Sequence, residues 1–279
     1  MLKLLIIIKE KKRNKMKINL SIIVPIYNAM KTLQKSLSSI SKQNIYLEKK
    51  IEILLIIDDG KNYKKMVPKM QKNMFVRFLK TNGIKTGPGN ARNIGLAKAR
   101  GEFIGFLDAD DEWSENYLEK MYESVKKNGL AFAPTRVYKN NVLIREFPGK
   151  NKKYLCVNDI GEIPCSYHPF VKRNLMYKFE KYRSQDVFNT AILLNKKNKV
   201  EMIETEYYKL NIQEESVTKE SGFSIKIDQA YRKYQIKSLK MKNIKVSKVF
   251  AVRRIKNKKF IKWVQKNKKS FYEFLSKVN

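Results

Sequence analysis

The sequence has two cysteines, a single histidine and no long apolar segment, and each shortage excludes a class of protein. Cys156 and Cys165 have neither metal-ligand spacing nor a second pair, which argues against a zinc site or a disulfide framework. They are expected to be reduced thiols. No stretch reaches the roughly 20 apolar residues that span a bilayer. We therefore expect a cytoplasmic protein that is neither exported nor membrane-spanning.

The first 16 residues are expected to be an extension outside the folded domain. The apolar run at 4–8 is too short for the core of a signal peptide, and charged residues follow it instead of a cleavage site. Organised sequence begins just after Met16, which is an alternative start of the chain.

Acidic residues are scarce relative to basic ones. The chain of 279 residues has 60 Lys and Arg against 26 Asp and Glu, a formal net charge of +34. Such a surface attracts polyanions, namely nucleic acid, anionic lipid headgroups or a phosphorylated substrate. The alternative is that the lysines reflect the codon bias of an AT-rich genome. Composition alone leaves both interpretations open.

Apolar strands alternate with amphipathic helices in the first half of the chain. Strand-like apolar runs occur at 20–25, 51–57, 75–79 and 103–107, with helices expected at 90–99 and after an N-cap at Ser114. This alternation predicts an α/β fold with a mostly parallel central sheet flanked by helices. Ligands of such sheets bind at the carboxyl ends of the strands.

The second half is less regular. Strand-like runs at 130–138 and 142–147 precede a helix that is expected to begin at Ser184. Residues 226–279 contain 18 Lys and Arg but only two acids. Six apolar residues of this tail fall near one helical stripe: Phe260, Trp263, Val264, Phe271, Phe274 and Leu275. We expect this stripe to dock on an anionic membrane surface; the alternative is that it packs on the rest of the protein.

The sharpest chemical signal is an acidic cluster directly after the expected strand at 103–107. Asp108 and Asp110 are two positions apart, so on extended backbone their carboxylates share one face. Two such carboxylates suit a hard divalent cation with open positions for phosphate oxygens. The alternative is an acidic turn in which Asp111 and Ser114 only cap the next helix.

Two further clusters are weaker when taken alone. Asp58, Asp59 and Gly60 end the second apolar run, where a carboxylate can bind a nucleobase or ribose, or simply end a strand. Residues 87–95 (GPGNARNIG) combine glycines, which let backbone approach a ligand, with Arg92, whose planar fork suits a diphosphate.

In their order and spacing these segments resemble glycosyltransferase family 2. The resemblance rests on residues 21–28 (SIIVPIYN), 58–60 (DDG), 89–95 (GNARNIG) and 99–113 (ARGEFIGFLDADDEW). It is strong from about 18 to 113 and continues weakly to about 216. It implies an inverting enzyme with the A-type (GT-A) nucleotide-sugar transferase fold.

The resemblance implies a set of residues that bind the nucleotide sugar: Pro25, Tyr27, Asp58, Asp59, Arg92, Asp108 and Asp110. Asp108 and Asp110 match the family's metal motif, with Asp110 the more direct ligand of Mg²⁺ or Mn²⁺. In the family a Glu-Asp pair precedes a helix on the acceptor side. Here Gln185 replaces the Glu, while Asp186 keeps the position of the catalytic base.

The predicted organisation is a glycosyltransferase domain at 17–222, with a nucleotide-sugar half at 17–113 and an acceptor half at 114–222, and a basic tail at 223–279. The predicted reaction moves a sugar from a nucleotide diphosphate, with UDP favoured, to a glycan or lipid-linked acceptor of bacterial surface polysaccharide or glycolipid assembly. No specific nucleic acid is expected as a partner. His168 is a weak candidate for a metal or acid role, and Trp113 is as typical of a core anchor as of a sugar platform.

Two alternatives explain parts of the pattern. A non-catalytic nucleic-acid-binding protein accounts for the net charge but not for acids at strand ends. A nucleotidyltransferase shares the sheet and metal site, but it is expected to have a glycine-rich, basic triphosphate loop after the first strand. That place holds Pro25, Ile26, Tyr27 and Asn28.

Overall fold

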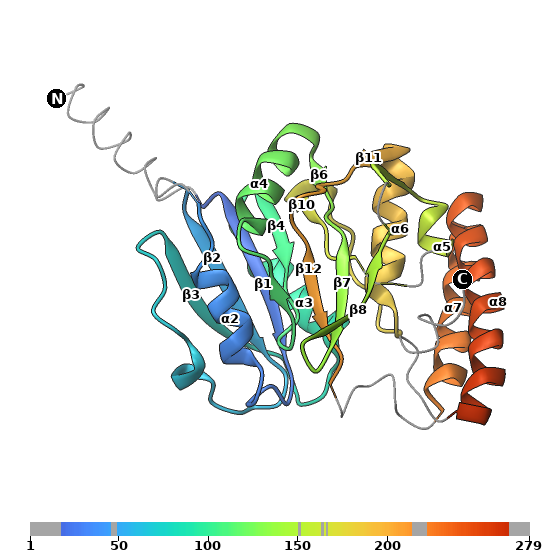
Figure 1. The fold of residues 1–279 in the computed structure, drawn as a ribbon, viewed down its shortest axis with the longest axis horizontal. Coiled ribbons are helices and arrows are strands. Elements are labelled where there is room, and N and C mark those ends of the chain that lie inside the picture. Colours follow the sequence, from blue (N-terminus) through green and yellow to red (C-terminus); the bar gives the residue numbers. More distant parts are fainter. Residues whose placement is uncertain are drawn as a thin grey trace.

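A six-stranded sheet forms the centre of the computed structural model, which describes residues 18–45, 49–149, 152–162, 165, 167–213 and 222–267. The strand order is β3-β2-β1-β4-β10-β6 (Figure 1). Four neighbouring strands are parallel: β1 (Leu20–Ile26), β2 (Ile51–Ile57), β3 (Met74–Lys80) and β4 (Phe103–Phe106). Strand β10 (Phe170–Lys172) runs antiparallel to β4 and to β6 (Leu130–Ala131). The predicted α/β fold with a mostly parallel sheet is confirmed.

Helices cover both faces of this sheet. On one face lie α2 (Leu33–Ser41) and α4 (Tyr117–Asn128), and on the other lie α3 (Pro88–Lys98) and α6 (Gln185–Lys197). Successive residues of a strand point to opposite faces, so Ile22 packs with α2 and α4 while Ile23 packs with α3. A continuous apolar run is what a strand buried on both faces requires.

Short strands complete the acceptor side. One sheet has the order β5-β12-β7-β8 and a pair joins β9 to β11. Their bounds, with those of the short helices, are β5 (Glu112–Trp113), β7 (Thr135–Lys139), β8 (Val142–Phe147), β9 (Tyr154–Cys156), β11 (Lys199–Glu201), β12 (Tyr208–Asn211), α5 (Asp159–Glu162), η1 (Lys64–Met66) and η2 (Arg173–Leu175).

Two sequence predictions about this region were wrong. The single strand expected at 130–138 is divided into β6 and β7, which belong to different sheets and are separated by Pro134, a residue without a backbone donor. Ser114 does not cap α4, because its hydroxyl donates to the Glu206 carboxylate at 2.6 Å and Asn116 occupies the N-cap position.

The basic tail forms two helices, α7 (Phe223–Lys240) and α8 (Ile244–Asn267), which lie side by side at one edge of the molecule (Figure 1). Tyr234 of α7 stacks on Phe188 of α6 and Phe250 of α8 packs against the same ring at a tilt, within the same hydrophobic cluster as the sheet. The helix pair therefore shares a core with α6 and the central sheet, and the domain boundary at 222 stays a prediction.

The membrane-docking stripe predicted for this tail is wrong in its described members. Phe260 is 2% exposed and packs with Val137, Phe147 and Ile212, and Trp263 packs against the same cluster. Phe260 is buried and Trp263 is partly buried because the second sheet offers them an apolar surface. Phe271, Phe274, Leu275 and the side chain of Val264 lie outside the described residues.

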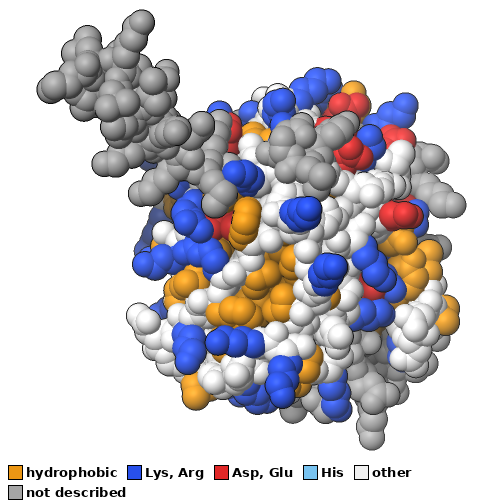
Figure 2. Space-filling model, turned by 90° about the vertical axis from the view of Figure 1, so that its left-hand side faces the viewer, with side chains coloured by type: hydrophobic (Ala, Val, Ile, Leu, Met, Phe, Trp, Pro, Cys, Tyr) orange, Lys and Arg blue, Asp and Glu red, His pale blue; other side chains and the backbone are white. Residues whose placement is uncertain are grey.

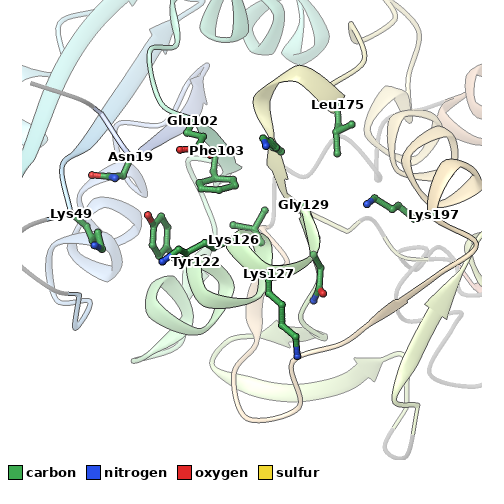
Figure 3. A pocket seen from close by; sticks show the side chains of 13 residues that line it. Asn19, Lys49, Glu102, Phe103, Tyr122, Lys126, Lys127, Gly129, Leu175 and Lys197 are labelled. Carbon is green, nitrogen blue, oxygen red and sulfur yellow. The ribbon is translucent and has the colours of Figure 1, made fainter. Parts of the chain in front are cut away.

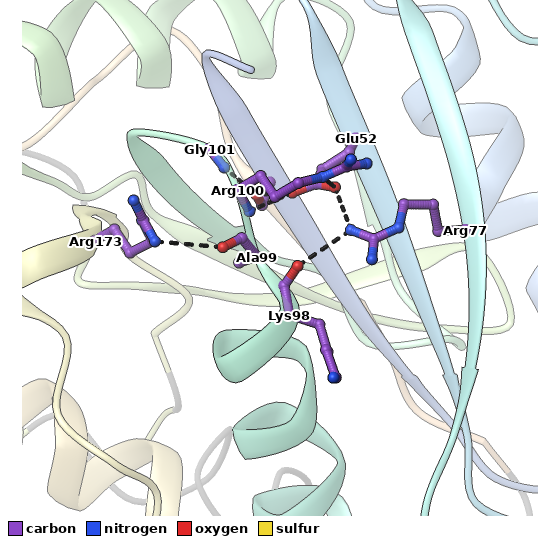
Figure 4. A network of polar contacts seen from close by, with 8 residues as sticks. Glu52, Arg77, Lys98, Ala99, Arg100, Gly101 and Arg173 are labelled. Atoms are coloured by element: carbon purple, nitrogen blue, oxygen red, sulfur yellow. Dashed lines mark hydrogen bonds and ion pairs between the residues drawn. The ribbon is translucent and has the colours of Figure 1, made fainter. Parts of the chain in front are cut away.

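A buried carboxylate fixes the amino-terminal edge of the sheet (Figure 4). Glu52, fully buried on β2, accepts hydrogen bonds from Ser21 Oγ at 2.7 Å, from the Arg100 backbone N–H and from Arg77 Nη1 at 2.6 Å. Gly101 N–H donates in turn to Ser21 Oγ at 2.8 Å. The network joins β1, β2 and β3 to the turn before β4.

The outer surface is strongly basic. On the face at the β3 edge, Lys and Arg side chains surround a central apolar area and acidic side chains are few (Figure 2). No helix in the described part of the chain has the length and apolar character needed to cross a membrane.

Candidate active site

Adjacent parallel strands β1, β2 and β4 bring three of the predicted segments to one edge of the sheet. Asp59, after β2, accepts hydrogen bonds through Oδ2 from the Asn28 backbone N–H at 2.8 Å and from the Tyr63 hydroxyl at 2.6 Å. Burial opposes ionisation of Asp59, but these hydrogen bonds outweigh it and lower its pKa. The carboxylate is therefore an ionised acceptor next to Tyr27, which is 49% exposed. Pro25, half-buried within β1, lies opposite Ile56 of β2.

Asp58 has a different environment from its neighbour. Its buried carboxylate accepts hydrogen bonds from Thr81 Oγ1, Thr86 Oγ1 and N–H, and the Gly87 N–H, at 2.7 to 3.0 Å. These bonds hold the loop that leads into α3. Asp58 thus positions the backbone around the site, and its contact with a nucleotide stays a prediction.

The glycines of α3 pack against protein. A Cβ at Gly95 would lie 2.5 Å from Ile23 of β1, and one at Gly89 would collide with the Glu180 carbonyl oxygen. These positions are small so that α3 can approach its neighbours closely. Our interpretation of both as points of ligand approach was therefore wrong.

Asp108, after β4, is held by two cationic or potentially cationic side chains. Arg92 of α3, 3% exposed, forms an ion pair with Oδ1, and His168 Nε2 lies 3.3 Å from Oδ2. Burial opposes ionisation of Asp108, but Arg92 and His168 hold its pKa well below the usual range. The imidazole stacks on Tyr208 with ring centroids 4.2 Å apart. Asp108 is therefore an anion whose two oxygens already face Arg92 and His168.

Asp110 is the open carboxylate of the cluster. Its side chain is exposed, and no other described residue donates a hydrogen bond to its carboxylate. Desolvation by the surrounding protein and repulsion by the neighbouring Asp108 carboxylate raise the pKa of Asp110 to about 6. Asp111 is instead buried, where its oxygens accept from the Tyr208 hydroxyl and the Asn211 N–H, both at 2.9 Å.

These residues fit a divalent cation that is shared with a ligand. A cation beside Asp110 would relieve its repulsion by Asp108, and the exposed side chain leaves room for phosphate oxygens and water. Within the described ranges no group of three or more His, Cys, Asp or Glu side chains converges as a complete metal cage. The protein would thus supply a minority of the ligands, as Mg²⁺ sites with bound phosphates do.

The acceptor-side residues meet this cluster at the start of α6. Arg92 Nη1 donates to Gln185 Oε1 at 3.2 Å, and a cavity of about 10 Å³, the size of one water, is lined by Arg92, His168 and Asp186 among others. Asp186 is half-buried in the first helical turn, where the helix dipole favours a carboxylate. No described residue donates a hydrogen bond to it.

The structure therefore places Arg92, Asp108, Asp110 and Asp186 in one neighbourhood. The sequence did not reveal that the hydroxyls of Tyr63 and Tyr208 hydrogen-bond to Asp59 and Asp111. It also did not show that His168 lies beside Asp108. No local signal marks the two tyrosines, because each meets its partner only through folding. Trp113 stacks on Tyr117 in the core and is an anchor of α4.

A larger cavity lies elsewhere. Its volume is about 460 Å³, and it opens beside Asn19 and Glu102, at the amino ends of β1 and β4 (Figure 3). Five lysines line it: Lys49, Lys126, Lys127, Lys172 and Lys197. It contains none of the predicted site residues and is separate from the carboxylate edge.

Comparison with known proteins identifies the family. The model of glycosyl transferase family 2 matches residues 21–197, more than half of the chain, and this range includes every site residue that the sequence predicted. The chain belongs to glycosyltransferase family 2. Membership disfavours both the nucleic-acid-binding and the nucleotidyltransferase alternatives.

Two curated relatives of this family 2 chain are similar over part of their length. The minor teichoic acid biosynthesis protein GgaA of Bacillus subtilis is 39% identical over 106 residues, 37% of this chain and 24% of that protein. An Escherichia coli UDP-Glc:α-D-GlcNAc-diphosphoundecaprenol β-1,3-glucosyltransferase, WfgD, is 34% identical over 134 residues, 47% of this chain and 51% of that enzyme. The match thus spans between a quarter and half of these relatives.

A solved structure shares the fold. TarS of S. aureus, residues 1–349, in complex with UDP-GlcNAc, aligns with a TM-score of 0.60 at 19% identity, covering 77% of this chain and 66% of that chain. At this identity the likeness shows the GT-A fold alone.

Proposed function

We propose that this chain transfers a sugar from a UDP-sugar, with inversion at the anomeric carbon, to a hydroxyl of a glycan or lipid-linked acceptor. One observation carries the proposal: Arg92 joins Asp108, on the strand edge that would hold the donor, to Gln185, the neighbour of the candidate base Asp186. Donor and acceptor machinery are thus linked through one buried guanidinium.

The nucleoside would bind at the ends of β1 and β2. The ionised Asp59 accepts hydrogen bonds, and the N3–H of uracil is a hydrogen-bond donor. Tyr27, half-exposed beside it, offers an aromatic face to the base. Support for UDP comes from WfgD, whose name specifies UDP-Glc, and from the TarS complex with UDP-GlcNAc.

The diphosphate would bind near Asp110 with Mg²⁺ or Mn²⁺. When bound, the cation supplies Lewis-acid stabilisation of the departing diphosphate. Asp110 is the residue that would hold it, because its carboxylate alone in the cluster is both exposed and without a partner. Asp108 would contribute to cation binding with a carboxylate whose orientation is fixed by Arg92 and His168.

Asp186 would act as the general base. It would take the proton of the acceptor hydroxyl while that oxygen forms a bond to the anomeric carbon and the bond from that carbon to the diphosphate oxygen breaks. A single displacement of this kind inverts the configuration. Arg92, 3% exposed and paired with Asp108, contributes fixed positive charge beside the leaving group.

The acceptor class is supported by the names of relatives. WfgD is named for a diphosphoundecaprenol-linked acceptor and GgaA for teichoic acid biosynthesis. A lipid-linked acceptor would place the enzyme at a membrane surface, which agrees with the high net charge.

A nucleotide-release assay tests the proposal. The chain is incubated with a panel of UDP-, GDP- and dTDP-sugars and polyprenyl-diphosphate-linked acceptors, with Mn²⁺ or with EDTA. The proposal expects release from a UDP-sugar that requires both acceptor and metal. Release that is equal in EDTA would remove the cation from the reaction, and release from a GDP- or dTDP-sugar alone would contradict the choice of nucleotide.

A further inference from the structure

The turn between α7 and α8 presents apolar side chains to solvent. We call residues 236–248 the α7–α8 turn. Four of its side chains are exposed: Ile236 by 46%, Leu239 by 53%, Met241 by 38% and Ile244 by 63%. They are a third of the twelve large apolar side chains found exposed in the described part of the chain, yet they occupy only nine positions. Single exposed apolar residues are ordinary, but a cluster of this density marks an interaction surface.

The backbone of this turn is fixed, so its apolar side chains cannot fold inward. Lys242, with φ of 55°, donates its N–H to the Leu239 carbonyl at 2.8 Å, and the Asn243 N–H donates to the Ser238 carbonyl at 2.8 Å. The inward positions are already filled by Ser238 and Val246, both fully buried. The exposed cluster is thus a preformed feature of the helix pair.

Lysines alternate with these apolar residues. Lys240, Lys242, Lys245 and Lys248 are exposed, and none of them pairs with an acid of the described residues. The sequence from 229 to 267 contains no Asp or Glu. Within the turn Lys237 is paired with Glu180, and the other four lysines are not paired with an acid of the described residues. Apolar side chains at the tip of a helix pair, with unpaired cations between them, match the interface of an anionic bilayer, where apolar groups enter the acyl boundary and cations meet headgroup phosphates.

We infer that the α7–α8 turn inserts into the surface of an anionic phospholipid bilayer. Leu239, Met241 and Ile244 enter the interface, and Lys240, Lys242 and Lys245 contact headgroup phosphates. This assigns membrane contact to a surface other than the buried stripe that contains Phe260. The inference goes beyond the proposed function, because binding to the bilayer needs neither donor nor acceptor.

Vesicle flotation with the full chain tests this inference. Phosphatidylcholine vesicles are compared with vesicles that contain equal parts of phosphatidylglycerol. Three exposed lysines at the far end of α8, changed as Lys258→Gln/Lys259→Gln/Lys262→Gln, are the charge-matched control for Lys240→Gln/Lys242→Gln/Lys245→Gln. The apolar pair Leu239→Ser/Ile244→Ser is matched by Val142→Ser/Leu143→Ser on β8, where both side chains are exposed.

We expect binding to the anionic vesicles alone. The lysine variant should lose at least ~10-fold in binding, since each lysine contributes about fivefold. The Leu239→Ser/Ile244→Ser variant should lose as much, because two apolar side chains would no longer be buried in the interface. The control variants should stay within about twofold of the parent protein. A Met241→Trp variant should show blue-shifted emission on binding, with quenching by lipids brominated near the headgroup beyond that of the parent. Nucleotide release with a water-soluble acceptor should be the same in all variants, so a failure of docking is distinguishable from a failure of catalysis.

Four results would overturn the inference. Unchanged flotation of Leu239→Ser/Ile244→Ser, or no added quenching of Met241→Trp, would show binding by charge without insertion. Equal losses in the turn and control lysine variants would show a diffuse electrostatic contact. Complete displacement of the protein from vesicles by inorganic polyphosphate at physiological salt would point to a soluble polyanion as the partner.

Discussion

Arg92 Nη1 donates a 3.2 Å hydrogen bond to Gln185 Oε1, although the two residues are 93 positions apart in the chain. The same guanidinium forms an ion pair with Asp108. Burial opposes a charged Arg92, but the carboxylates of Asp108 and Asp186 outweigh it and raise the pKa of Arg92. The family's Glu is replaced here by a neutral amide that keeps an acceptor oxygen facing the buried cation.

Gln185→Leu should therefore lower both stability and transfer. The change removes the acceptor of a buried guanidinium N–H, which costs about 1–3 kcal/mol of unfolding free energy. Gln185→Glu keeps an acceptor oxygen and should retain most of the stability. Urea unfolding and nucleotide release measure the two effects. A Leu variant as stable and active as the parent would show that the contact with Arg92 has no role.

Asp110→Ala should abolish the contribution of Mn²⁺ to UDP binding. Calorimetric titration of UDP with and without Mn²⁺ is expected to show metal-enhanced affinity in the parent and none in the variant. Glu115→Ala is the control, since Glu115 is an exposed carboxylate on the same segment with no described role in the site. Metal enhancement that persists in Asp110→Ala would move the cation to another ligand.

Asp59→Asn should weaken the binding of uridine as well as of UDP, because it replaces the ionised acceptor that we propose faces the base. We expect a loss of roughly 1.5–3 kcal/mol, the contribution of a hydrogen bond to a charged group. Tyr63→Phe should give a smaller loss, since it removes only the hydroxyl that orients Asp59 and accepts from the Ala29 N–H. Nucleoside titration checks the order; equal affinity in all three proteins would place the base elsewhere.

Glu52→Gln should destabilise the protein in a pH-dependent way. Burial opposes ionisation of Glu52, but hydrogen bonds from Ser21, Arg100 and Arg77 outweigh it and lower its pKa below the ordinary 4.5. The resulting stability is present above about pH 4.5 and is lost as the pH falls through the lower folded value.

At neutral pH we expect Glu52→Gln to cost about 1.5–3 kcal/mol of unfolding free energy, and this difference should shrink on acidification. Arg77 and Arg100 are partly exposed, so water compensates the cations that remain. Urea titrations at several pH values test this; a difference that is constant down to acid pH would exclude the linkage.

The edge of the sheet that would bind the sugar donor was predictable, because its sequence signals are local. Asp58 and Asp59 directly follow the apolar run of β2, and Asp108 follows that of β4. Each of these segments therefore indicates both a buried strand and the carboxylates at its end. In a parallel sheet these ends must share one edge, so sequence order alone brought the carboxylates together. The same reasoning could not separate Asp58, whose oxygens hold a loop, from Asp59.

The acceptor side was less predictable because its contacts are long-range. His168 meets Asp108 only through β10, a three-residue antiparallel strand with no periodic signal of its own. The sequence placed Phe260 in a membrane-facing stripe. It could not show that Phe260 is buried, because β7, β8 and the segment after β12 cover this ring only in the folded chain. The surface of the α7–α8 turn became visible only once the buried faces of both helices were known.

The rate of a single turnover in Asp186→Asn tests the central claim most directly. With a saturating UDP-sugar, its acceptor and Mn²⁺, we expect transfer to fall by about 10²–10⁴-fold, the contribution of a general base. Donor affinity should be unchanged, and the midpoint of thermal unfolding should fall only slightly, since no described residue hydrogen-bonds to this carboxylate although its charge favours the buried Arg92 cation. Transfer at the parent rate, with donor binding intact, would contradict the assignment of Asp186 as the base.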